Sequence, residues 1–204
     1  YSDWWMLRLE EKLTQTKDSL QALREQVDQA LADVPPAEIV TAWADPLTGL
    51  GNRALLESEL DRMILRGQRS PTGFALLYID LDYFKQINDS YGHEAGDRVL
   101  QQLASLLINS SRAGDYLFRL GGEEFLMLLV DTGLDGARRV AEKLRRGVEQ
   151  EVFRLPQDRT LNITLSIGVA CFNGHPDYQQ LMRRADDGLY QAKHSGRNRV
   201  VVVE

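Results

Sequence analysis

Residues 116–130 read YLFRLGGEEFLMLLV, and this stretch decides the fold. Two apolar, strand-forming runs flank Gly121-Gly122, which is typical of a hairpin closed by a tight glycine turn. Residues 73–82 read GFALLYIDLD, a third β-rich run that ends in carboxylates and predicts a buried strand. If this strand pairs with the hairpin, Asp80 and Glu123 meet at one edge of a sheet.

Helical patterns alternate with these strands along the rest of the chain. We predict helices over 53–67, 83–92, 94–111, 136–151 and 178–196, and further strands over 161–172 and 198–204. Gly196 is the expected C-terminal cap of the last helix. This order predicts an α+β fold with a central, mostly antiparallel sheet flanked by helices.

The first 44 residues differ in composition from the rest. All 16 glycines lie at or after Gly49, and all three tryptophans lie at or before Trp43. Residues 6–34 carry a heptad pattern, whose core positions are Met6, Leu13, Leu20, Val27 and Val34, alternating with Leu9, Thr16, Leu23 and Ala30. Pro35-Pro36 should end this helix. We therefore predict a coiled-coil signalling helix and linker over residues 1–44, and a separate domain over 45–204. An amphipathic helix packed on its own domain is the alternative.

Composition excludes several classes of protein. The 24 Lys and Arg against 30 Asp and Glu give a net charge of −6, which argues against a bulk nucleic-acid binder. A single cysteine, Cys171, excludes a disulfide framework and a multi-cysteine zinc site. No apolar run is long enough for a transmembrane helix. Because the chain begins at Tyr1, we expect a fragment of a longer signalling protein, which could be anchored to a membrane upstream.

The carboxylates predict a metal site. Asp80 and Asp82 end a buried strand, where carboxylates are costly unless they are paired with cations or metals. Gly121 and Gly122 allow a tight turn with room for a ligand above it, and Glu123 and Glu124 follow at once. Hard oxygen ligands of this kind suit Mg²⁺. Either motif alone could be a surface turn.

Nearby cations and polar groups suit a nucleotide. Lys85, Lys193 and Arg197 could hold the oxygens of a triphosphate, although Lys193 alone could be a solvated charge at a helix end. Asn88 and Asp97 supply an amide and a carboxylate, which together could bind the edge of a guanine.

Six ordered motifs resemble one known family. DPLTGLGNR, DLDYFKQIND, GHEAGDRVL, RLGGEEF, TLSIGVA and ADDGLYQAKHSGRNRV occur over residues 45–203 in the order and spacing of GGDEF-domain diguanylate cyclases, with GGEEF as a variant of the family motif. The resemblance implies a fold like the palm of polymerases and class III nucleotide cyclases. It also implies condensation of two GTP into cyclic di-GMP with release of two pyrophosphates, in a cytoplasmic homodimer.

By the same resemblance, each motif residue has an expected role. Asp80, the backbone carbonyl of Leu81, Glu123 and Glu124 would hold Mg²⁺, or Mn²⁺ in its place. Asp80, Lys85, Glu123 and Glu124 would be the catalytic residues. The substrate would be bound by Tyr83, Phe84, Lys85, Asn88, Asp97, Gly121, Gly122, Lys193 and Arg197. The residue types leave open whether Glu123, Glu124 or water accepts the proton of the attacking hydroxyl.

The resemblance also implies a feedback site. Arg112-Ala-Gly-Asp115 matches the family's R-x-x-D inhibitory motif, which would bind the product, cyclic di-GMP. A turn with a local Arg–Asp pair is the alternative at this position. For the whole chain, the alternatives to an enzyme are a catalytically silent nucleotide receptor and a structural coiled coil that carries the domain as cargo.

Overall fold

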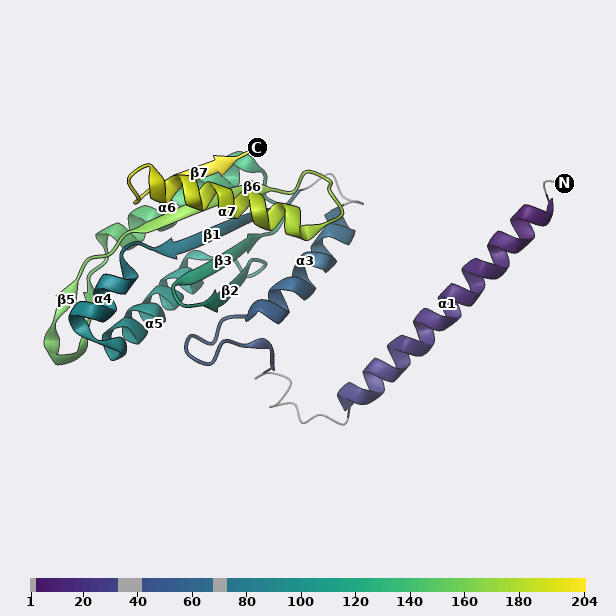
Figure 1. The fold of residues 1–204 in the computed structure, drawn as a ribbon, viewed down its shortest axis with the longest axis horizontal. Helices are drawn as coiled ribbons and strands as arrows, with labels where there is room; N and C mark the ends of the chain where they lie inside the picture. Colours follow the sequence, from purple (N-terminus) through teal and green to yellow (C-terminus); the bar gives the residue numbers. More distant parts are fainter. Residues whose placement is uncertain (1–2, 33–41, 68–72) are drawn as a thin grey trace. The chain divides into compact units, whose positions relative to one another are not determined.

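The computed structural model describes residues 3–32, 42–67 and 73–204 and divides the chain into two compact units (Figure 1). The units are Tyr1–Ala42 and Trp43–Glu204. The division lies two residues before the boundary that the composition predicted. Within the described residues, no helix has the length and apolar character needed to cross a membrane.

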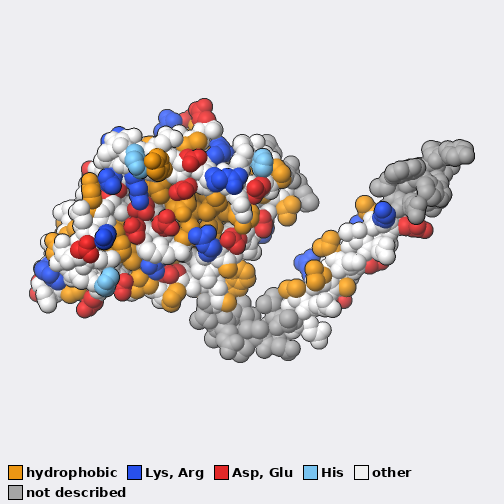
Figure 2. Space-filling view, viewed as in Figure 1, with side chains coloured by type: hydrophobic (Ala, Val, Ile, Leu, Met, Phe, Trp, Pro, Cys, Tyr) orange, Lys and Arg blue, Asp and Glu red, His pale blue; other side chains and the backbone are white. Residues whose placement is uncertain are grey.

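The described part of the N-terminal unit includes the helix α1 (Asp3–Ala32). Four residues of the heptad core, Leu13, Leu20, Leu23 and Val27, have exposed side chains, with exposures of 49–64%. Apolar side chains are spaced along α1 between charged ones (Figure 2). An exposed apolar stripe on a helix is what a second helix can cover. Pro35-Pro36, the predicted helix end, lies outside the described residues.

The C-terminal unit is built on a five-stranded sheet with the order β2-β3-β1-β6-β7. The strands are β1 (Ala75–Leu81), β2 (Tyr116–Gly121), β3 (Glu124–Leu129), β6 (Leu165–Cys171) and β7 (Val200–Val203). β1 pairs with β3 and β6, and β2 with β3, all antiparallel. Only β6 and β7 are parallel among these pairs. The predicted α+β fold with a mostly antiparallel central sheet is confirmed.

Helices cover both faces of the sheet (Figure 1). They are α3 (Arg53–Gly67), α4 (Phe84–Tyr91), α5 (His93–Ser110), α6 (Leu134–Gln150) and α7 (Tyr178–His194). Side chains alternate across the strands, so one set of strand residues packs with α4, α5 and α6 and the other set packs with α3 and α7. The α7 backbone lies directly on β6 at Gly168. A Cβ there would overlap the carbonyl oxygen of Ala185 and the amide of Leu189, so the close packing requires glycine at this position.

The prediction of one strand is wrong at its start. The predicted strand over 161–172 is divided into a two-residue strand, β5 (Thr160–Leu161), and β6, which begins at Leu165. β5 pairs with β4 (Phe153–Arg154) in a small separate sheet, around a short 3-10 turn, η1 (Pro156–Asp158). Two-residue strands carry too few residues to show the alternation that identifies a strand.

Candidate functional site

The carboxylates meet where β1 ends beside β3. Asp80 pairs in register with Glu124, while Glu123 lies one residue away in the turn of the hairpin. The ladder continues through Ile79–Phe125 and Tyr78–Leu126. Tyr78 and Leu126 pack on the α3 and α7 face, and residues two apart share a face. Asp80 and Glu124 therefore lie on the same face, under α7.

Asp80 is buried and only half satisfied. Its Oδ2 accepts from Lys193 Nζ at 2.9 Å, whereas Oδ1 is one of the buried oxygens without a hydrogen-bond partner among the described residues. Burial raises the pKa of Asp80 to about 6, Lys193 opposes this rise, and the charges of Glu123 and Glu124 add to it. A buried carboxylate of this kind favours a further cation.

Glu124 is held in a negative environment. Burial, and then the charges of Asp186 and Glu123, raise the pKa of Glu124, while Lys193 and Arg53 oppose the rise. Burial together with the charges of Glu124 and Asp186 raises the pKa of Tyr78 to about 12. The surplus of negative charge at this edge again favours a bound cation.

The donor set fits a magnesium ion. Among the described residues, no three His, Cys, Asp or Glu side chains converge closely enough to enclose a metal ion. Mg²⁺ usually takes only one or two carboxylates and keeps waters and substrate phosphates as its other ligands. The buried Oδ1 of Asp80, without a protein partner, has the chemistry of such a ligand.

Asp82, two residues further on, is satisfied by the protein instead. Its Oδ1 accepts from Ser166 Oγ at 2.6 Å. Its Oδ2 accepts from Thr164 Oγ1 at 2.6 Å and from the backbone amide of Asn198 at 3.0 Å. Every one of these donors belongs to the chain itself, so the carboxylate of Asp82 is not directed to a ligand.

Tyr83 and Arg197 lie against each other. The Arg197 guanidinium carbon is 4.7 Å from the centre of the Tyr83 ring. Both residues have left-handed backbone, with φ 58° and φ 62°. Lys85 is exposed on the first turn of α4, whereas the Phe84 side chain is buried in the core, so only its backbone can face a ligand. The fold thus brings one cation, Arg197, against Tyr83, which lies three residues after Asp80.

Asn88 and Asp97 come from facing helices, α4 and α5. Asn88 Oδ1 is buried without a hydrogen-bond partner in the described chain, and it lies over Gly96, where a Cβ would overlap it. Asp97 is exposed on the next position of α5. An unpartnered amide oxygen beside an exposed carboxylate is available to a polar ligand.

The Gly121-Gly122 turn is tied to the start of the domain by one arginine. Gly121 and Gly122 have φ 134° and 51°, which L-residues rarely adopt. Arg119 donates from Nε and Nη2 to the carbonyl of Gly122, at 3.1 and 2.9 Å. Its Nη1 bonds both carboxylate oxygens of Asp45, at 3.0 and 3.1 Å. Burial would raise the pKa of Asp45, but hydrogen bonds from Thr48 and Arg119 outweigh it and lower the pKa.

Arg112 and Asp115 form a turn between α5 and β2. The Asp115 carboxylate accepts from the backbone amide of Arg112 at 3.0 Å, not from its guanidinium. The Arg112 side chain is exposed and has no ion pair within the part of the chain that the structure describes. The structure therefore contains the turn with a local Arg–Asp contact that the sequence left open, made through the backbone amide of Arg112 and not through its guanidinium.

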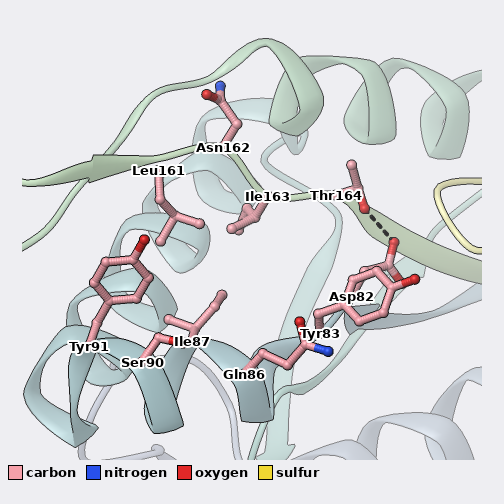
Figure 3. Close-up of a pocket in the computed structure, with 10 residues that line it drawn as sticks. All are labelled: Asp82, Tyr83, Gln86, Ile87, Ser90, Tyr91, Leu161, Asn162, Ile163 and Thr164. Atoms are coloured by element: carbon pink, nitrogen blue, oxygen red, sulfur yellow. Dashed lines mark hydrogen bonds between the residues drawn. The ribbon is translucent and has the colours of Figure 1, made fainter.

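A pocket of about 460 Å³ borders this region without including Asp80 or Glu124 (Figure 3). It lies between α4 and the segment 161–164, with Tyr83, Ile87 and Tyr91 on the helix side. Thr164 points to Asp82 at its rim. Because Asp82 and Tyr83 belong to its lining, the pocket adjoins the charged edge.

Sequence reasoning missed three charged residues of the site. Asp186 and Arg53 act electrostatically on Glu124, and Arg119 joins Asp45 to the glycine turn. Asp186 lies seven residues before Lys193 in α7, and that helical spacing could have placed the two on one face. Arg119 is a charge within an otherwise apolar hairpin, which is a usable signal. Nothing in the sequence around Arg53 marks it.

The comparisons with known proteins agree with this geometry. The family model described as "Diguanylate cyclase, GGDEF domain" matches residues 42–199, and a model described as "Transcriptional regulator AcaB" matches only residues 1–44. Diguanylate cyclase DosC of Escherichia coli K12 is 42% identical over 156 residues, which are 76% of this chain and 34% of DosC. Response regulator PleD of Caulobacter vibrioides is 44% identical over 162 residues, 78% of this chain and 36% of PleD. The chain thus spans about a third of the length of these relatives.

A solved structure is similar over both units of the chain. The coiled coil and GGDEF domain of DgcB from Caulobacter crescentus, in complex with c-di-GMP, matches with a TM-score of 0.76 and 30% identity. The match covers 96% of this chain and 99% of that one. The family model alone matches more than three quarters of the residues. The chain therefore belongs to the family of GGDEF-domain diguanylate cyclases.

Proposed function

We propose that this chain is a diguanylate cyclase, which condenses two GTP into cyclic di-GMP and releases two pyrophosphates. The observation that carries the proposal is the half-satisfied Asp80, with Oδ1 unpartnered and Oδ2 on Lys193, paired in register with Glu124. Family membership supports the same activity. A substrate of this kind also implies a cytoplasmic location.

The metal would be held by Asp80, the carbonyl of Leu81, and Glu123, with Glu124 as a further carboxylate. Bound Mg²⁺, or Mn²⁺, supplies Lewis-acid stabilisation of the phosphate oxygens. Burial, and after it the charges of neighbouring carboxylates, raise the pKa of Asp80 and Glu124, and both effects favour a cation bound there.

The chain's own groups would orient the substrate. Lys85, Lys193 and Arg197, with the backbone amides of Tyr83 and Phe84, would bind the triphosphate. Asn88 and Asp97 would bind guanine, and Gly121 and Gly122 would leave room for the nucleotide. The 3′-oxygen of one GTP then bonds to the α-phosphorus of the other, the bond to pyrophosphate breaks, and the hydroxyl proton passes to Glu123, Glu124 or water. Positioning of this kind supplies much of the rate in phosphoryl transfer.

Purified protein incubated with GTP and Mg²⁺ tests this proposal, with products separated by chromatography. We expect cyclic di-GMP from the wild type and from Glu151→Gln, which removes an exposed carboxylate away from the site, and none from Glu124→Gln. A silent receptor would bind GTP in a thermal-shift assay and form no product, and a scaffold would show no shift. Denaturing an inactive sample would release any trapped product.

We further propose that two copies pair through the heptad of α1. One domain would bind one GTP, so two domains must face each other, and a shared coiled coil raises the effective concentration of each half-site. The exposed stripe of Leu13, Leu20, Leu23 and Val27 supports this pairing. Leu20→Glu should shift the sedimentation of the chain to monomer, while Ala22→Glu, on the outward side of the heptad, should leave the dimer intact. An unchanged sedimentation of Leu20→Glu would show that α1 is not the dimeriser.

We also propose that cyclic di-GMP inhibits the enzyme at Arg112 and Asp115. The exposed guanidinium of Arg112 has no ion-pair partner among the described residues, and guanidinium groups bind phosphate and guanine bidentately. Arg112→Ala should abolish inhibition by added cyclic di-GMP without lowering the initial rate. Arg146→Ala, at another exposed arginine, is the matched control. Equal inhibition of both variants would remove the assignment.

A further inference from the structure

The loop after α7 has an unusual backbone. Three successive residues, Gly196, Arg197 and Asn198, have positive φ angles of 113°, 62° and 45°. Left-handed backbone is unfavourable for a non-glycine residue, and it persists only where the surroundings impose it. Two adjacent non-glycine residues in this region therefore require specific restraints.

Asp82 provides one restraint, from the sheet. Its Oδ2 accepts from the backbone amide of Asn198 at 3.0 Å. The carboxylate itself cannot turn away, because Ser166 and Thr164 donate to its two oxygens at 2.6 Å each and the residue is only 4% exposed. The bond with Thr164 is visible in Figure 3.

Helix α6 provides the second restraint. Arg145 Nη1 donates to Asn198 Oδ1, and Asn198 Nδ2 donates to Glu149 Oε1, both at 2.7 Å. The loop is also closed onto α7, since the amide of Arg197 donates to the carbonyl of Ala192 at 3.0 Å. Asn198 is thus fixed through both its backbone and its side chain.

These restraints decide where Arg197 lies. Its guanidinium is over the Tyr83 ring, and Tyr83 directly follows Asp82 in the chain. Asp82 is joined to Tyr83 by a peptide bond. It also restrains Arg197, because it accepts a hydrogen bond from the amide of Asn198, the residue that follows Arg197. No other carboxylate among the described residues is bonded to this loop backbone.

We propose that Asp82 is a positioning residue for the nucleotide. It fixes the Gly196–Asn198 loop so that Arg197 is presented, beside Tyr83, to the terminal phosphates of a nucleoside triphosphate. This inference rests on the proposed function. It gives Asp82 a role in substrate affinity that acts through Arg197 and not through a metal ion.

A double-mutant cycle tests the inference, with KM and kcat for GTP measured at fixed Mg²⁺. We expect Asp82→Asn to raise KM about 10-fold and to change kcat far less, because orienting residues of this kind act on affinity. In an Arg197→Ala background, Asp82→Asn should leave KM unchanged, because Asp82 acts on affinity through the side chain of Arg197, which is then absent. Thr132→Val, which deletes a buried hydroxyl bonded to Val130, should change KM in neither background.

A second variant covers the case in which Asp82→Asn does not fold. Thr164→Val combined with Ser166→Ala leaves Asp82 in place but removes the two hydroxyls that orient it. It should raise KM about 3-fold, and again only when Arg197 is present.

If the Asp82 substitution raises KM equally with and without Arg197, or does not raise it at all, the role of Asp82 is overturned. Formation of cyclic di-GMP by the wild type would still support the proposed function in that case. Absence of both GTP binding and product in the wild type would overturn both.

Discussion

Asp80 and Asp82 are two buried carboxylates at the same sheet edge, yet their surroundings differ. Both oxygens of Asp82 accept hydrogen bonds from the chain itself, whereas Oδ1 of Asp80 has no partner among the described residues. A buried polar atom without a partner costs free energy, so it persists where a ligand can compensate. Burial alone therefore does not mark a carboxylate that binds a ligand directly. A buried carboxylate oxygen that has no partner in the protein does.

The largest effect should come from removing Asp80. Asp80→Ala should lower cyclic di-GMP formation about 100-fold or more, because the loss of a metal-site carboxylate is poorly compensated. Its melting temperature without metal should change little, since the ion pair with the partly exposed Lys193 is lost but a buried oxygen without a partner is removed as well. A melting temperature several degrees below that of the wild type would show that Asp80 is mainly structural and that the two carboxylates do not differ in the way described.

Asp82→Ala should show the opposite pattern in stability. The substitution leaves the hydroxyls of Thr164 and Ser166 and the amide of Asn198 without their acceptor. We expect the free energy of unfolding to fall by about 3 kcal/mol, measured by urea denaturation. A loss below about 1 kcal/mol would mean that water replaces these hydrogen bonds.

The pH dependence of stability gives a further test of the environment of Asp80. The pKa of Asp80 is raised to about 6 from its ordinary value of 3.8, so the folded state binds its proton more tightly than the unfolded state. The contribution of Asp80 to the free energy of unfolding is therefore favourable at low pH and is lost as the pH rises through about 4 to 6. Without metal, Asp80→Asn should therefore exceed the wild type in unfolding free energy by about 1–2 kcal/mol at pH 8, and by less at pH 4.

Chemical denaturation at the two pH values, with EDTA present, measures this difference. Added Mg²⁺ should stabilise the wild type and not Asp80→Asn. An advantage of the variant that is the same at both pH values would mean that Asp80 keeps an ordinary pKa.

The smallest effect should come from Gly96. Asn88 Oδ1 is a second unpartnered oxygen, and a Cβ at Gly96 would displace it. Gly96→Ala should raise KM for GTP about 10-fold, since an orienting contact is lost, while helix propensity keeps the stability within about 1 kcal/mol. Gly147→Ala, in open space on α6, is the control and should leave KM unchanged. An unchanged KM in Gly96→Ala would remove Asn88 from the nucleotide site.

Much of this arrangement could be predicted from the sequence. The hairpin, the buried strand that ends at Asp80 and the order of helices all follow from periodicity and glycine position. The partner of Asp80 in the ladder could not be predicted. Which glutamate faces Asp80 depends on the register of β1 against β3, and that register pairs Asp80 with Glu124 and not with Glu123.

The role of Asp82 was equally hidden from the sequence. A second carboxylate after a buried strand has the same pattern as the first. The donors that distinguish it come from Ser166, Thr164 and Asn198, far along the chain. Contacts made by tertiary structure leave no periodic signal in one sequence. The same reason explains why Arg119, which meets Asp45 across the fold, was missed.

The contact between Lys193 and Asp80 has a consequence for biosynthesis. The two residues are separated by more than half of the chain, and α7, which carries Lys193, packs directly on β6. Such long-range contacts form late, once the loops between them have closed. A nascent chain that stops before α7 would carry Asp80, Glu123 and Glu124 but would lack Asp186, Lys193 and Arg197. We therefore expect catalytic competence to arrive only once α7 and the loop that follows it have been synthesised.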